Sequence, residues 1–358
     1  MKKNGLLVYG GIISILLVAA TFIIPSDKSS ITSGVSFQAA RIMEESIGII
    51  SVYCRENNIN INEVNDPGLT GLIGPEMSDI TTTIGHLEAK RTTLDPVFAS
   101  LVTDLLTEAG VRRGDTIAMG CSGSFPGLLI ASVSAVKAMN LNARIIISLG
   151  SSSYGANNPD FTILDIYRIL MENDIIETGP AAVSLGGEMD RGEGFEGNIA
   201  EQLKIRILTS GIPFIYENDL QLNVSERESI YLGSHTRNIS AFINTGGSYA
   251  NMGTSALSLM LQPGRVGKVA IPGNKEKGVI FSMLEKGIPV IHMLNIRGVC
   301  QRYNLSWDPV SGQDSSGDEY PVRNSSHPAP AISIIFLAAF SIFLILYNRL
   351  NSINNYSF

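Results

Sequence analysis

Short apolar runs alternate with amphipathic segments through the middle of the chain, a pattern that predicts alternating strands and helices. The predicted strands cover residues 116–119, 144–149, 181–185, 214–216, 239–244, 269–271 and 290–292. The predicted helices cover residues 96–109, 126–139, 161–172, 198–209 and 275–285. Strands separated by helices favour a sheet with helices on both faces. The predicted fold class is therefore α/β, with a doubly wound, mostly parallel, Rossmann-like sheet.

Each end of the chain carries a long apolar run, at residues 6–24 and 331–347. Each run is about long enough to span a bilayer as a helix. Lys2 and Lys3 precede the first run and favour a cytoplasmic amino terminus. A cleaved signal peptide is the alternative for the first run, and a buried core helix is the alternative for the second. The sequence predicts a sheet between two terminal transmembrane helices, in a two-pass protein of the cell membrane with cytoplasmic termini and an extracytoplasmic main domain.

The same pattern predicts the domain organisation. The predicted parts are an N-terminal membrane anchor (1–33), a helical stem (34–64), an α/β domain (65–305), a flexible linker (306–330), a C-terminal transmembrane helix (331–348) and a tail (349–358). The α/β domain begins with a loop, residues 65–93, that is rich in Gly, Pro and Thr and has no clean period. Because this loop is too long for an idle connector, we expect it to fold over a pocket or a partner.

Composition narrows the function classes. The chain has 358 residues, with 26 basic and 33 acidic side chains and a net charge of −7. No cluster of basic residues marks a nucleic-acid surface. Cys54, Cys121 and Cys300 are odd in number and widely spaced, which favours neither a disulfide framework nor a zinc site. The glycine pattern at residues 192–197 does not directly follow a strand and includes two Glu that would repel pyrophosphate. The sequence predicts no metal and no cofactor.

Four loops rich in Gly and Ser follow predicted strands, at residues 120–127, 150–157, 186–192 and 244–251. Ligands of open parallel sheets bind beyond the carboxyl ends of the strands, so we expect these loops to form one pocket. The alternative is that α/β folds need tight turns whatever they bind. The candidate ligand-binding residues in these loops are Ser122, Gly123, Ser124, Ser151, Ser152, Asn157, Gly186, Gly187, Asp190, Arg191, Asn244, Gly246, Gly247 and Asn251.

A serine hydrolase is one enzymatic interpretation of these loops. Ser122 or Ser124, then Asp190, then His292 follow the chain order of α/β-hydrolases. The match is incomplete, because Ser124 stands where the nucleophile elbow has its second glycine. A lone histidine at the end of a strand, such as His292, is also more often structural than catalytic.

Several segments resemble a known family. They are residues 70–76 (TGLIGPE), 81–83 (TTT), 87–92 (LEAKRT), 122–126 (SGSFP) and 155–157 (GAN). Over about residues 35–300 the chain resembles the bacterial family called poly-γ-glutamate system protein. The resemblance implies a membrane-associated accessory that works beside the ligase and export subunits of poly-γ-glutamate production. It implies no catalytic residues.

Poly-γ-glutamate is a polyanion and the domain is acidic, so local donors would have to bind it. In the 65–93 loop, the candidate ligand-binding residues are Glu76, Thr81, Thr82, Thr83, Lys90 and Arg91, although Lys90 and Arg91 could equally be a solvated pair. The leading hypothesis is an accessory that binds the polymer or its synthase and export subunits. The alternative is a hydrolase or transferase that cleaves, releases or attaches the polymer with a serine nucleophile.

Overall fold

The computed structural model describes residues 28–233 and 239–308. The chain divides into two units, residues 1–31 with 321–358, and residues 32–320. The elements described below belong to the second unit, apart from the first residues of α2 (Lys28–Glu56). The two predicted membrane spans, most of the predicted linker and the tail lie outside the described residues.

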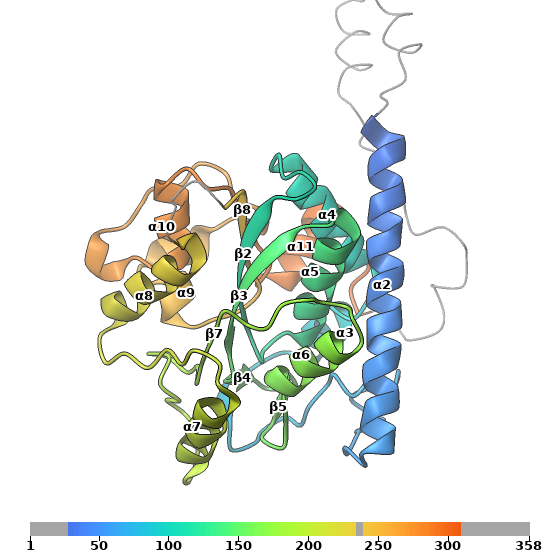
Figure 1. Cartoon of the computed structure of the whole chain (residues 1–358), viewed down its shortest axis with the longest axis vertical. Coiled ribbons are helices and arrows are strands. Elements are labelled where there is room, and N and C mark those ends of the chain that lie inside the picture. Colours follow the sequence, from blue (N-terminus) through green and yellow to red (C-terminus); the bar gives the residue numbers. More distant parts are fainter. Residues whose placement is uncertain (1–27, 234–238, 309–358) are drawn as a thin grey trace, which may run out of the picture. The chain divides into compact units, whose positions relative to one another are not determined.

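A six-stranded sheet forms the centre of the second unit (Figure 1). Its strand order is β7 (Ala182–Ser184), β3 (Asn142–Ser148), β2 (Thr116–Ser122), β8 (Ala241–Asn244), β10 (Val290–His292) and β9 (Gly264–Arg265). The strands from β7 to β10 pair in parallel, whereas β9 pairs antiparallel with β10. The sheet is therefore mixed.

The structure corrects the predicted fold class and location. The protein is α/β with a mixed sheet, but a sheet held between two transmembrane helices is not supported. In residues 28–233 and 239–308, no helix combines the length and the apolarity that crossing a bilayer requires. The longest of these helices, α2, has 29 residues but carries charged side chains such as Arg41 and Glu44. On the same finding, the predicted two-pass membrane protein with an extracytoplasmic domain is not supported either.

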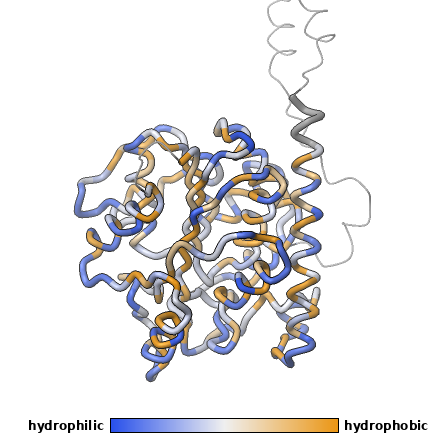
Figure 2. The backbone as a smooth tube through the Cα atoms, in the orientation of Figure 1, coloured by the Kyte–Doolittle hydropathy of each residue, from blue (hydrophilic) through white to orange (hydrophobic). Residues whose placement is uncertain are grey.

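Helices cover both faces of the sheet (Figure 1). On one face lie α2, α4 (Val97–Glu108), α5 (Pro126–Met139) and α6 (Ile163–Glu172), and on the other lie α8 (Leu220–Leu232), α9 (Tyr249–Met252) and α10 (Val279–Glu285). Alternate strand residues feed two apolar clusters, since Ile117 and Met119 join the first and Ala118 joins the second. Apolar residues accordingly concentrate along the central strands (Figure 2). The described residues also form the α-helices α3 (Leu87–Thr92), α7 (Ile199–Ser210) and α11 (Ile296–Tyr303).

Two pairs of short strands hold the loop after β3 in place. The strand β1 (Thr81–Thr83) pairs in parallel with β4 (Ser151–Ser152), and β5 (Asn157–Asn158) pairs antiparallel with β6 (Phe161–Thr162). The first pairing brings the 65–93 segment against the carboxyl end of the main sheet. That segment therefore packs on the domain through backbone hydrogen bonds rather than extending into solvent.

Two of the predicted segments do not form strands of the sheet. Residues 214–216 contribute a single bridge, between Val183 and Phe214. Residues 269–271 are not a strand, and the edge position belongs to β9. Gly264 in β9 has a φ of +78°, and a Cβ there would lie 2.1 Å from the Tyr303 hydroxyl oxygen. This edge is thus set by a close packing contact with α11 rather than by an apolar run.

Candidate functional site

A cavity of about 1070 Å³ lies at the carboxyl edge of the sheet. Loops that follow β2, β3, β7 and β8 all contribute to its wall, together with the segment 82–90 and the start of α11. Parallel strands bring their carboxyl ends to one edge, which is where open α/β sheets bind ligands. The cavity is therefore the candidate functional site.

The structure brings together about half of the sequence-predicted site residues. Those that line the cavity are Thr82, Thr83, Lys90, Ser122, Ser124, Ser152, Gly186, Gly187, Gly246 and Gly247. They come from all four Gly/Ser loops and from the 65–93 segment. The four loops thus share one cavity.

Other predicted residues lie behind the wall and shape the loops. Those outside the cavity lining are Thr81, Gly123, Ser151, Asn157, Asn244 and Asn251. Asn251 donates to the Gly246 carbonyl at 2.6 Å, and Asn157 donates to Thr81 Oγ1 at 2.9 Å. Both asparagines are fully buried. Their role in this structure is to hold backbone segments in place rather than to face a ligand.

Glycine is required where two of the loops touch. A Cβ at Gly246 would lie 2.2 Å from Ser122 Oγ and 2.7 Å from the Ser122 backbone nitrogen. A side chain at this position would therefore push the loops after β2 and β8 apart. The small residues of this edge serve close packing as well as any ligand.

Three charged candidates do not line the cavity. Glu76 is exposed to solvent. Arg91 forms a bidentate ion pair with Asp308, at 2.7 and 2.6 Å. The Arg191 guanidinium lies 5.6 Å from the centre of the Tyr216 ring. None of these three side chains is placed to meet a ligand in the cavity.

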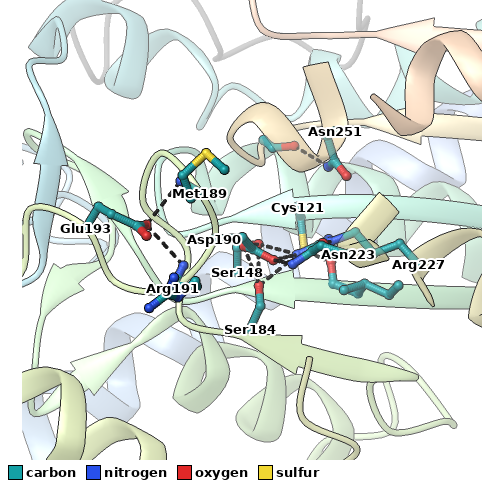
Figure 3. Close-up of polar contacts among 12 residues, drawn as sticks. Cys121, Ser148, Ser184, Met189, Asp190, Arg191, Glu193, Asn223, Arg227 and Asn251 are labelled. Carbon is teal, nitrogen blue, oxygen red and sulfur yellow. Dashed lines mark hydrogen bonds and ion pairs between the residues drawn. The ribbon is translucent and has the colours of Figure 1, made fainter. Parts of the chain in front are cut away.

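Asp190 belongs to a buried ion pair (Figure 3). Its carboxylate accepts from Arg227 at 2.5 Å, and neither side chain is exposed. Ser184 donates to the same carboxylate at 2.7 Å, and Asn223 donates to it at 3.0 Å. Arg227 in turn donates to Asn223 at 2.9 Å. With these partners, Asp190 holds the loop after β7 to α8, and within residues 28–233 and 239–308 no hydrogen bond or ion pair joins it to a histidine.

His292 does not complete a triad. It is 4% exposed, and its Nδ1 lies 3.3 Å from Asn244 Nδ2. Burial lowers the pKa of His292 to about 4. Since Asp190 pairs with Arg227 and His292 does not line the cavity, the predicted Ser–His–Asp arrangement is not assembled. Among the described residues, no group of three or more His, Cys, Asp or Glu side chains could hold a metal ion.

Lys90 has the most unusual environment in the cavity wall. It is 2% exposed, and its Nζ donates to Ser152 Oγ at 2.6 Å and to the Ser124 carbonyl. The Phe125 ring centre lies 3.8 Å from the same nitrogen. Burial lowers the pKa of Lys90 to about 7. The solvated pair of Lys90 and Arg91 is thus absent, because one is buried and the other is bonded to Asp308.

Sequence reasoning missed several residues of the wall. The missed charged and aromatic side chains are His86, Glu88, Phe125, Glu188, Glu193, Tyr249, Arg297 and Trp307. Arg297 lies at the start of α11, with its guanidinium 4.7 Å from the centre of the Trp307 ring. Trp307 is the only tryptophan of the chain, and that rarity was a signal. The residues that follow it have the composition of a linker, and this composition predicted a linker rather than a site.

Comparison of the chain with known protein families, with curated proteins and with solved structures finds no match.

Proposed function

We propose that this protein binds the amino-terminal end of a γ-glutamyl chain, as an accessory of poly-γ-glutamate production. The motif segments that resemble the poly-γ-glutamate system family suggest the pathway. The observation that carries the proposal is the cavity of about 1070 Å³, whose wall holds charges of both signs. Its volume is at the upper end of ordinary ligand pockets, which accommodates several linked residues.

The charges of the wall favour a chain end. Glu88, Glu188 and Glu193 line the cavity together with Arg297. A γ-glutamyl chain carries a carboxylate on every residue but a free ammonium only at its amino end. Carboxylates in the wall would repel the interior of such a chain, whereas they attract the terminal ammonium. The amino-terminal end of a γ-glutamyl chain, which carries an ammonium and carboxylates, is therefore the part whose charges complement both the acidic and the basic groups of the wall.

Arg297 is the best-placed group for a chain carboxylate. It is exposed at the cavity wall and lies over the Trp307 ring. It forms no ion pair with any residue in the described part of the chain. A guanidinium can donate two parallel hydrogen bonds to one carboxylate.

Titration of the purified full-length protein tests this function, because Trp307 is a built-in fluorescence reporter. We expect a γ-glutamyl hexamer to change the emission of Trp307 in a saturable way. Acetylation of its amino terminus should weaken binding about tenfold, equivalent to roughly 1.4 kcal/mol. Arg297→Gln should weaken it roughly 3- to 10-fold, which corresponds to one net hydrogen bond of about 1 kcal/mol at an exposed position.

Arg112→Gln is the matched control, because Arg112 is exposed and does not line the cavity. This variant removes the same charge and should bind like the wild type. The absence of any saturable binding would contradict the proposal. Equal affinities in the Arg297→Gln variant and the wild type would remove Arg297 from the site.

A further inference from the structure

We propose that Lys90 and Ser152 are a base and a nucleophile that hydrolyse amide bonds, with Ser152 Oγ attacking the carbonyl carbon. The natural substrate class, the amide of a γ-glutamyl chain, rests on the proposed function. The pair itself rests on the geometry of the two side chains. It replaces the Ser–His–Asp arrangement, whose members the structure keeps apart.

The first observation is the contact between the two side chains. Lys90 Nζ lies 2.6 Å from Ser152 Oγ, within the reach required for proton transfer. Both residues line the cavity, where a substrate carbonyl would lie. Ser122 has no such contact with a base. Ser124 Oγ accepts the backbone N–H of Ser152 at 3.0 Å and so positions the nucleophile.

The second observation is that Lys90 is buried without a carboxylate. It is 2% exposed and forms no ion pair in the described part of the chain. Burial of an unpaired ammonium is costly, and a buried lysine avoids that cost by releasing its proton. Burial accordingly lowers the pKa of Lys90 to about 7. A neutral amine at this pH is a competent general base.

The surroundings of Lys90 contain other charged groups. His86 and Glu88 line the cavity from the α3 side, Glu188 and Glu193 line it from the loop after β7, and Arg297 lines it from α11. None of these forms a hydrogen bond or an ion pair with Lys90. The immediate partners of the amine are Ser152, the Ser124 carbonyl and the Phe125 ring.

The third observation is that the nucleophile is held rigidly at the cavity wall. The backbone N–H of Ser153 donates to the Thr83 carbonyl at 3.0 Å, which anchors the loop to β1. A Cβ at Gly85 would lie 3.0 Å from Ser152 Oγ. Glycine at that position avoids this close contact, and Ser152, although only 7% exposed, lines the cavity.

The reaction balances with water as the second reactant. Lys90 Nζ takes the hydroxyl proton as Ser152 Oγ bonds to the carbonyl carbon. The carbon–nitrogen bond then breaks, and the Lys90 ammonium returns the proton to the leaving amine. Water attacks the resulting ester with Lys90 again as base, the ester bond to Oγ breaks, and Lys90 passes the proton back to Ser152. The products are one carboxylic acid and one amine.

Labelling of the full-length protein with a fluorophosphonate tests the pair. We expect one adduct, on Ser152, at a rate that rises about tenfold per pH unit below pH 7 and levels above about pH 8. Ser152→Ala should abolish the adduct. Lys90→Arg stays protonated at every pH of the assay and cannot act as a base, so its rate should fall by a factor of roughly 10² to 10⁴. Ser153→Ala is the matched control, because Ser153 is buried next to Ser152 but does not line the cavity.

Absence of an adduct on wild-type Ser152 between pH 6 and 9 would overturn the pair, and this result does not depend on whether a variant folds. An adduct on Ser122 or Ser124 instead would also overturn it. The Trp307 titration separates the two proposals. If the hexamer binds but Ser152 is not labelled, the base–nucleophile pair is wrong and the proposed function stands. If Ser152 is labelled but the hexamer does not bind, the pair stands and the proposed ligand is wrong.

Discussion

An Asp190→Ala variant is expected to lose about 3–5 kcal/mol of unfolding free energy. Asp190 and Arg227 are both fully buried, and their ion pair at 2.5 Å joins the loop after β7 to α8. Removal of the carboxylate leaves a guanidinium charge in the core without a partner. Urea denaturation followed by circular dichroism at pH 7 measures the loss.

Two further variants show whether the loss comes from the stranded charge. The Asp190→Ala/Arg227→Met variant removes both charges and should recover much of the stability, because no unpaired charge remains buried. Arg168→Gln breaks the pair with Glu172, whose side chains are 49% and 54% exposed, and should change the stability by less than about 1 kcal/mol. If Asp190→Ala loses no more unfolding free energy than Arg168→Gln does, a structural role for the buried pair is contradicted.

The stability of the protein is expected to rise with pH between 7 and 8.5, and Lys90 contributes up to about 2 kcal/mol of that rise. Burial lowers its folded-state pKa from 10.5 to about 7. In this window the unfolded chain keeps the proton and the native protein releases it, so stability increases with pH; below about pH 7 both states hold the proton and the contribution of Lys90 levels off. His292, with a pKa lowered to about 4 by burial, is neutral throughout the window.

The buried cysteines set the upper end of the pH range in which stability rises. Burial raises the pKa of Cys54 and Cys300 to about 11 and that of Cys121 to about 12. Above about pH 8.5 their thiols ionise in the unfolded chain first, which opposes the rise. Lys90→Met should remove the slope between pH 7 and 8.5 and should be more stable than the wild type near pH 6. The same slope in both proteins would show that Lys90 keeps its proton.

Some elements could be predicted because local chemistry decides them. The helix α5 has the predicted bounds, since Pro126 suits its first turn and Asn140 adopts a left-handed φ of 53° at its end. The strand β10 also has the predicted bounds, as a short apolar run that is fully buried. The helix α8 could not be predicted from periodicity, because it buries polar side chains. Arg227 and Asn223 are inside only because Asp190, distant in sequence, meets them there.

For the candidate site, too, some features could be predicted from the sequence and others could not. Loops rich in Gly and Ser could be assigned to one edge of the sheet, because strand direction places them there. The roles of individual side chains could not, since they depend on partners from other elements. Asp190 is a predicted catalytic and ligand-binding residue but faces Arg227, and Lys90 is predicted as either a ligand donor or half of a solvated pair but is buried against Ser152. Trp307 lies in the predicted linker, after the last predicted strand of the α/β domain, and reaches the cavity through tertiary packing alone.

A structure of the full-length Ser152→Ala variant, which cannot cleave its ligand, with a γ-glutamyl tripeptide bound is the most direct test of the proposed site. We expect the tripeptide in the cavity at the carboxyl edge of the sheet, with a carboxylate on Arg297, its ammonium near the acidic side chains, and an amide carbonyl beside position 152. Tripeptide bound on another surface, or an empty cavity at a saturating concentration of tripeptide, would contradict it.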